Sequence, residues 1–150
     1  MSVKAIQLSG PWSQSTTDAF LDGCTMPLRL STIAGDGFPR VASMWFRYEA
    51  GQLLCVTHKN SKVAKILRQN NRVGFEVSPN EPPYYGVRGQ GLVSIEKLGE
   101  SSLLEDLLAR YLGDTTSSFA QWLLGRKEEE LILSISPQRL YTWDYRERMP

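Results

Sequence analysis

The run from Thr57 to Lys62 contains the densest group of side chains suited to binding an anion, with the sequence Thr-His-Lys-Asn-Ser-Lys. It lies where a predicted strand ends and a predicted helix begins. Unpaired N–H groups and the positive end of the helix dipole favour a negative charge at such a point. Lys62 in the first turn is unfavourable for the helix alone, and a bound anion removes that conflict. The segment therefore predicts an anion site, with an ordinary solvated first turn as the alternative.

Arg40 is the second candidate for binding an anion. It opens a predicted strand directly after Pro39. A guanidinium group suits phosphate because its fork binds two oxygen atoms at once. If the two strand ends lie side by side, Arg40 reaches the same anion as Lys62. Otherwise it is a surface arginine at a strand end.

Several aromatic side chains could stack on a flat cofactor, although aromatic residues also fill protein cores and dimer interfaces. They are Trp45, Tyr84, Tyr85, Trp122 and Trp143. The single histidine, His58, could in principle act as a base for Ser61 or Cys55. Nothing in the sequence pairs a base with a nucleophile, so we assign no catalytic side chain.

The composition limits the classes of function. The chain has 150 residues, of which 41% are hydrophobic, and its net charge is +1, which argues against disorder and against broad nucleic-acid binding. Two cysteines and one histidine form neither a zinc set nor a multi-histidine metal site. No apolar run approaches the roughly 18 residues of a membrane span. We expect a cytoplasmic protein with reduced thiols, a small-molecule substrate and no membrane partner.

In the first half of the chain, hydrophobic periodicity predicts a short helix and then three strands. The helix is capped by Ser15 or Thr16 and ends near Gly23. The strands run over residues 26–34, 39–48 and 52–57. Their links are too short for parallel crossovers, so we expect an antiparallel meander.

In the second half, the sequence predicts a helix capped by Asn60, then strands interrupted by a helical segment. Ser102 and Glu105 match a capping box, and glycines at 86, 89 and 91 are expected to curve a long strand. The elements are a helix to about 70, strands over 72–77 and 84–97, helices over 102–113 and 118–124, and strands over 131–136 and 140–144. The whole chain, 1–150, is predicted to be one α+β domain. Its core is an antiparallel barrel of six to seven strands, with a helical insertion at about 100–130.

The order and spacing of several short segments resemble the pyridoxamine 5'-phosphate oxidase-like family of FMN-binding split β-barrels. The similarity covers roughly residues 26–97 and 131–145. Its segments are 35–46 (Gly-Asp-Gly-Phe-Pro-Arg-Val-Ala-Ser-Met-Trp-Phe), Thr57, 61–63, 71–73, 87–91 and 135–144.

The resemblance implies a homodimer with two FMN sites at the subunit interface, each built from both chains. By position, Arg40 and Lys62 would hold the FMN phosphate, and Ser61 and Thr57 would add hydrogen bonds. Tyr84 falls where the family places a contact from the partner chain, and Trp143 would cover the ring. The strand along the edge of the isoalloxazine would contain Val41, Ala42, Ser43, Met44 and Trp45.

The C-terminus departs from the pattern of true pyridoxamine phosphate oxidases. These end in a substrate-binding Arg-x-His segment, whereas this chain ends Tyr-Arg-Glu-Arg-Met-Pro. We therefore expect an FMN-dependent oxidoreductase that transfers a hydride to or from another small molecule. The alternatives are a deazaflavin-dependent reductase, a non-catalytic flavin-binding module, and a structural dimer whose basic helix docks an acidic partner. Haem is the least favoured cofactor, because His58 is the only imidazole.

Overall fold

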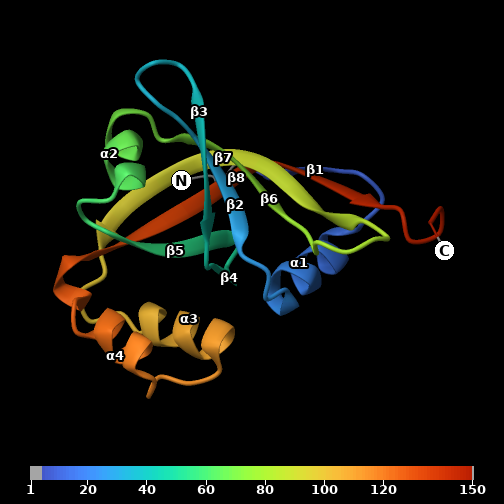
Figure 1. The fold of residues 1–150 in the computed structure, drawn as a ribbon. Coiled ribbons are helices and arrows are strands. Elements are labelled where there is room, and N and C mark those ends of the chain that lie inside the picture. Colours follow the sequence, from blue (N-terminus) through green and yellow to red (C-terminus); the bar gives the residue numbers. More distant parts are fainter. Residues whose placement is uncertain (1–4, 150) are drawn as a thin grey trace.

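The computed structural model describes residues 5–149, and within them the chain forms one strongly curled sheet of eight strands with helices on its outside (Figure 1). The strand order is β3-β2-β6-β7-β8-β5-β4, with β1 parallel to β8 and all other pairs antiparallel. The elements are β1 (Gln7–Ser9), α1 (Gln14–Gly23), β2 (Leu28–Ile33), β3 (Pro39–Met44), β4 (Arg47–Glu49), β5 (Gln52–His58), α2 (Lys62–Gln69), β6 (Arg72–Val77), β7 (Tyr85–Lys97), α3 (Leu103–Leu112), α4 (Ser118–Leu124), the 3₁₀ turn η1 (Lys127–Glu129) and β8 (Glu130–Asp144).

Two long strands, β7 with 13 residues and β8 with 15, form the spine of the curl because they pair with each other along the whole of β7. Glycines let their backbones approach closely where the sheet bends. A Cβ atom would lie 2.5 Å from the Arg139 carbonyl oxygen at Gly89 and 2.4 Å from that of Ser136 at Gly91. The pairing register shifts between Gln90 and Gly91, so the curvature predicted for this glycine-rich strand is present.

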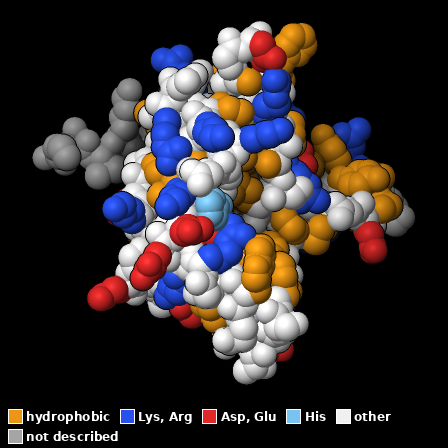
Figure 2. Space-filling model, turned by 60° about the vertical axis from the view of Figure 1, so that its left-hand side comes forward, with side chains coloured by type: hydrophobic (Ala, Val, Ile, Leu, Met, Phe, Trp, Pro, Cys, Tyr) orange, Lys and Arg blue, Asp and Glu red, His pale blue; other side chains and the backbone are white. Residues whose placement is uncertain are grey.

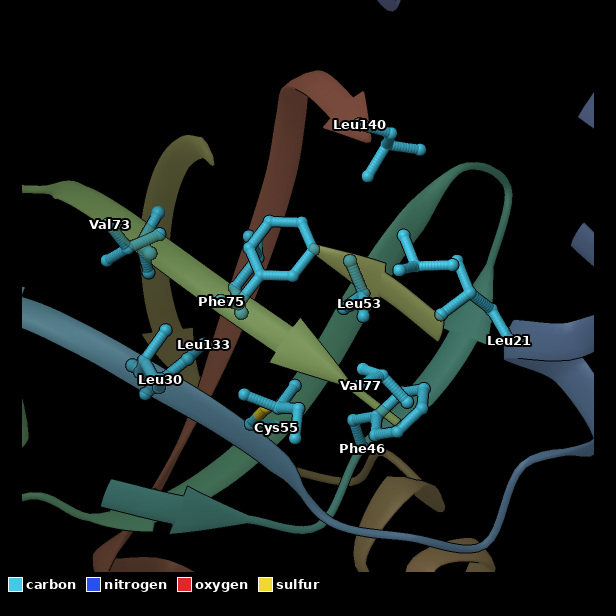
Figure 3. Packing of buried hydrophobic residues seen from close by; sticks show 14 of the residues in the cluster. Leu21, Leu30, Phe46, Leu53, Cys55, Val73, Phe75, Val77, Leu133 and Leu140 are labelled. Carbon is cyan, nitrogen blue, oxygen red and sulfur yellow. The ribbon is translucent and has the colours of Figure 1, made fainter. Parts of the chain in front are cut away.

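The concave side of the sheet contains the main hydrophobic core. Figure 3 shows Leu30, Cys55, Phe75 and Leu133, from four different strands, packed toward one another. A second cluster joins α3 and α4 to the sheet through Leu104, Leu107 and neighbouring apolar side chains. The expected helical segment at 100–130 therefore packs against the barrel through a core of its own. Within residues 5–149, no helix has the length and apolar character needed to cross a membrane.

The predicted meander is wrong at its second strand, because the predicted strand 39–48 breaks at Trp45–Phe46. Its first part, β3, pairs with β2, while its last part, β4, pairs with β5 at the other end of the strand order. Phe46 is completely buried, and its backbone N–H and C=O both bond to the Tyr111 hydroxyl, each at 3.2 Å. A side chain from α3 thus replaces the strand partner, and the chain crosses from one sheet edge to the other.

The predicted number of strands and the predicted C-terminal strands also differ from the structure. The sheet has eight strands in the described residues rather than six or seven, because the short strands β1 and β4 were not foreseen. The two predicted C-terminal strands are one, β8, since Pro137 lies at the register shift opposite Gly91 and does not end the strand.

The helix caps differ as well. Ser13 and Ser61 cap α1 and α2, one or more residues away from the predicted caps, and Ser102 forms no capping hydrogen bond because its hydroxyl donates to Asp106 instead.

Candidate functional site

A cavity of about 460 Å³ opens between the edge of the sheet and the two helices of the 100–130 segment. Residues 42–45 of β3 and its extension, residues 56–58 of β5, and Val63 of α2 form one wall. Leu104, Leu107, Phe119 and Leu123 form the opposite wall. A pocket of this size is typical of a small-molecule or cofactor site.

The β3 wall offers free backbone hydrogen-bonding groups. In the described sheet, β3 is an end strand that pairs with β2 on one side only. The predicted residues Ala42, Ser43, Met44 and Trp45 all line the cavity, whereas Val41 does not and is 70% exposed. An unpaired strand edge can meet the alternating N–H donors and carbonyl acceptors of a flat heterocycle.

Trp45 is fixed by a residue from the helical segment. Its ring stacks on Tyr111 of α3 with centroids 5.3 Å apart and planes within 5°. The Tyr111 hydroxyl is anchored at the same time to the backbone of Phe46. Burial raises the pKa of Tyr111, so its hydroxyl stays protonated and donates. Helix α3 therefore sets the position of this part of the cavity wall.

The start of α2 contains the predicted group of hydroxyls. Ser61 is the N-cap, and its Oγ accepts from the Ala64 N–H at 3.1 Å and from the Thr57 hydroxyl at 2.9 Å. Thr57 lines the cavity, and Lys62 is the first helical residue, exposed on the surface. The first turn of α2 contains no acidic residue. Thr57 and Val63 line the cavity, whereas Ser61 and Lys62 lie at the start of α2 outside its lining, with Ser61 joined to it through the Thr57 hydroxyl.

Basic side chains surround this helix start. Figure 2 shows lysine and arginine side chains gathered on one face of the molecule, around the histidine. The exposed basic residues contributed by α2 and the turn before it are Lys59, Lys62, Lys65 and Arg68. This face therefore favours an anionic ligand, although the net charge of the chain is only +1.

Arg40 is hydrogen-bonded to Asp36 rather than to another of the predicted phosphate ligands. Its Nη2 is 2.8 Å from Oδ2 of Asp36 in the β2–β3 turn, and both side chains are about half exposed. The hydrogen bond from Arg40 lowers the pKa of Asp36. No hydrogen bond joins Arg40 to α2 within residues 5–149, and one of the two terminal nitrogens of Arg40 is taken up by Asp36.

Tyr84 and Trp143 line a different pocket, also of about 460 Å³. They lie there with Tyr141 and Arg88, whose guanidinium is 4.5 Å from the Tyr141 ring centroid and 5.8 Å from that of Trp143. Neither residue lines the cavity beside β3. Within one chain the structure does not bring these two predicted contacts together with the rest of the site.

The sequence reasoning missed Arg126 and Glu130, a charged pair that lines the cavity. Arg126 Nε donates to Glu130 Oε1 at 2.8 Å, and Glu130 is only 5% exposed. A glutamate at the start of an apolar strand, four residues after an arginine, was the available signal.

A nucleophilic role for Cys55 or Ser61 finds no support. Burial raises the pKa of the Cys55 thiol to about 12. The His58 ring bonds instead to Glu129, at 2.8 Å through Nε2, and to the Asn60 N–H through Nδ1. The Ser61 hydroxyl is already committed to capping α2.

No protein-family model and no curated protein matches the sequence. Solved structures do match. A conserved hypothetical protein, Rv2991, from Mycobacterium tuberculosis has a TM-score of 0.78 at 23% identity, over 92% of this chain and 88% of that one. An F420 reductase has a TM-score of 0.68 at 24% identity, over 80% of this chain and 92% of that one.

A protein from Listeria innocua provisionally named as a pyridoxamine 5'-phosphate oxidase has a TM-score of 0.64 at 19% identity, over 85% of this chain and 95% of that one. The fold also occurs in the heme storage protein HutZ from Vibrio cholerae. The chain therefore has the split-barrel fold of the pyridoxamine 5'-phosphate oxidase-like proteins, as its sequence segments predict. That fold serves both oxidoreductases and a heme storage protein, so function has to be argued from the site.

Proposed function

We propose that this protein is a flavin-binding oxidoreductase that transfers a hydride to or from a small organic molecule, with FMN as its cofactor. One observation carries the proposal. A single cavity is lined by an unpaired strand edge and an apolar wall, and it reaches Thr57 and Val63 at the start of a helix whose exposed surface carries basic side chains. These match the polar ring edge, the flat apolar ring and the phosphate of a flavin nucleotide.

Different residues would bind the ring and the phosphate of the cofactor. The backbone of β3 from Ala42 to Trp45 would face the polar atoms of the ring. Thr57, Ser61 and the first-turn N–H groups of α2 would meet the phosphate, with Lys62 adding a charge. When bound, the cofactor supplies the hydride chemistry, and the chain supplies orientation and exclusion of water. We assign no side chain as a general acid or base.

A deazaflavin is the second candidate cofactor. The basic residues continue along α2 through Lys65 and Arg68, beyond what one phosphate needs. A deazaflavin of the F420 type has a longer and more acidic tail, which this face could receive. The similarity in fold to an F420 reductase supports this candidate.

We also infer a homodimer. Ile33, Phe38 and Val41, on the β2–β3 hairpin, are 42%, 68% and 70% exposed. A second copy packed on this hairpin would cover them, and Tyr84 and Trp143 of one copy could then reach the β3 cavity of the other. The shared site expected from the resemblance requires this arrangement.

Titration of the purified protein with FMN, and separately with F420, tests cofactor binding through changes in the visible spectrum. Lys62→Ala is expected to weaken binding by about 1.5–3 kcal/mol, the range for hydrogen bonds to charged groups. Lys97→Ala, an exposed lysine outside the cavity lining, is the matched control and should bind like the parent. No spectral change with either cofactor overturns the proposal, and the tighter of the two identifies the cofactor.

Stopped-flow reoxidation separates an enzyme from a non-catalytic flavin-binding module. The protein is loaded with cofactor, reduced chemically and mixed with candidate acceptors. An oxidoreductase shows a rate that rises with the concentration of its acceptor. A rate that is the same with every acceptor and with none supports the binding module.

A further inference from the structure

The cavity has two walls of different chemistry. The sheet wall carries the free β3 edge and the Thr57 hydroxyl, which suit the cofactor. The helical wall carries Leu104, Leu107 and Leu123, with Phe119 at 50% exposure on its rim. An aliphatic and aromatic surface of this kind binds an apolar molecule. The helical half of the cavity is therefore available to a substrate lying against the cofactor.

The Arg126–Glu130 pair is the polar element of this half of the cavity. Glu130 opens β8, directly opposite His58 in the pairing with β5, and its carboxylate is buried. Arg126 uses Nε to bond Glu130 Oε1. Within the described residues, neither terminal nitrogen of this guanidinium makes a hydrogen bond to the protein. The N–H groups on the two terminal nitrogens of Arg126 are thus donors left unpaired by residues 5–149 at an otherwise apolar cavity wall.

Two contacts fix the plane of the Arg126 guanidinium. Glu130 holds one edge, and the Trp122 ring lies across its face, 4.5 Å from ring centroid to Cζ. A guanidinium held on an edge and a face loses little further entropy when it binds a ligand. Glu130 is in this sense a positioning residue for Arg126.

We propose that the helical half of the cavity binds an uncharged, apolar substrate with one hydrogen-bond-accepting oxygen, and that Arg126, held by Glu130, donates to that oxygen. This substrate class rests on the proposed function, since it assumes that the sheet half holds the cofactor. Arg126 is then the residue that determines substrate specificity, and α4 supplies the apolar surface beside it.

The charge balance favours a neutral substrate over an anion. Glu130 compensates the positive charge of Arg126 at hydrogen-bonding distance. The nearby His58 is bonded to Glu129, a second carboxylate. A substrate carboxylate placed at the free donors of Arg126 would lie close to the carboxylate of Glu130 in a partly desolvated site, where repulsion is poorly screened. A neutral oxygen accepts the same hydrogen bonds without that repulsion.

Three matched probes test this inference: 2-acetylnaphthalene, 2-naphthoate and 2-ethylnaphthalene. They share an apolar body and differ in carrying a neutral acceptor, an anionic acceptor or none. Affinities are measured by tryptophan fluorescence, with and without added cofactor. We expect 2-acetylnaphthalene to bind about tenfold more tightly than the other two, the effect of one good hydrogen bond to a charged donor.

Variants of the pair identify the residues responsible. Arg126→Met should abolish the preference for the acetyl over the ethyl probe, and Glu130→Gln should selectively strengthen binding of naphthoate. The double variant Arg126→Met with Glu130→Gln removes both charges, so it keeps the test valid if the single Arg126 variant unfolds around an unpaired carboxylate. Arg148→Met, an exposed arginine outside the cavity lining, is the control.

Equal affinity of the parent for all three probes, or a preference for the acetyl probe that survives loss of Arg126, overturns the inference. Cofactor titrations of the same variants keep this result separate from the proposed function. Failure to bind FMN and F420, with the probe preference intact, rejects the cofactor and leaves the pocket chemistry standing. Normal cofactor binding with no probe preference rejects only the substrate class.

Discussion

The ion pair between Arg40 and Asp36 competes with any anion that Arg40 could bind. The Asp36 carboxylate occupies the guanidinium in the β2–β3 turn, and both groups are exposed. Neutralising Asp36 would free Arg40 to bind a phosphate at the start of α2. It would also remove one negative charge that repels an approaching phosphate.

Asp36→Asn is therefore expected to tighten cofactor binding by about twofold to fivefold, in keeping with the small effect of an exposed ion pair. The measurement is a titration of the variant and the parent at low and high salt, because screening should shrink the difference. Asp22→Asn, an exposed aspartate at the end of α1, controls for the general loss of a charge. Weaker cofactor binding by Asp36→Asn would show instead that the ion pair between Arg40 and Asp36 supports binding.

At the scale of elements, the contact between α3 and the β3–β4 crossing determines the shape of the cavity. The Tyr111 hydroxyl is the hydrogen-bond partner of both backbone groups of the buried Phe46. Tyr111→Phe keeps the ring that stacks on Trp45 but leaves those two groups without their partner. The expected loss is about 1–3 kcal/mol of unfolding free energy, measured by urea denaturation.

Tyr145→Phe is the matched control, because Tyr145 is exposed and its hydroxyl makes no hydrogen bond within the described residues. It should unfold like the parent. If Tyr111→Phe also unfolds like the parent, α3 is held by the apolar cluster alone and the hydroxyl is not an anchor.

The sequence predicts those parts of the fold that depend on local patterns of residues. Helix α2, strand β6 and helix α4 follow from short periodic patterns and lie where they were predicted. The break at Trp45–Phe46 does not show in the sequence, because the apolar alternation continues through it and the group that satisfies the Phe46 backbone lies 65 residues away. Pairing partners are set by the whole sheet, so the meander was a reasonable but wrong extrapolation.

The same distinction applies to the site. Thr57, Ser61 and Lys62 are neighbours in sequence, so they lie close together at the start of α2, and the structure adds the hydrogen bond from Thr57 to Ser61. Arg126 and Glu130 reach the cavity only because α3, α4 and the start of β8 fold back over β5. Tyr84 and Trp143 lie together in a separate pocket of the single chain, and only the proposed second copy would bring them to the cavity.

At the scale of the whole molecule, Asp144 ties together the two ends of the described chain. Its Oδ2 accepts from the Trp12 indole N–H at 3.0 Å and pairs with Arg146 at 2.5 Å. These hydrogen bonds, that of Arg146 above all, lower the pKa of Asp144 well below its usual value. Because the folded state binds this proton less readily than the unfolded state, the resulting stability is present above pH about 4 and is lost as the pH falls further.

Thermal melts at pH 7 and at successively lower pH test this tie. Asp144→Asn should lower the melting temperature at pH 7 and flatten its dependence on pH below about 4, relative to the parent. Asp22→Asn again serves as the control, and its melting curve should track that of the parent at every pH. Parallel pH curves for parent and Asp144→Asn would contradict the assignment.

A site shared between two copies makes a prediction about mixtures of defective chains. Lys62→Ala damages the phosphate end of the site, and Trp143→Ala damages the aromatic contact proposed to come from the other copy. In a heterodimer of these variants, one site receives both defects and the other receives none. Random reassociation places half of the chains in heterodimers, so about a quarter of the sites should recover tight cofactor binding.

The experiment unfolds the two variants together, refolds them, and measures the fraction of high-affinity sites by cofactor titration. Lys62→Ala refolded with Thr57→Val is the control. Both of these residues lie at the same helix start of one chain, so every heterodimer site keeps one defect and no recovery is expected. Sedimentation velocity on the parent reports whether a dimer exists at all. A dimer whose Lys62 and Trp143 variants fail to complement would place the aromatic pocket outside the cofactor site and leave the β3 cavity complete within each chain.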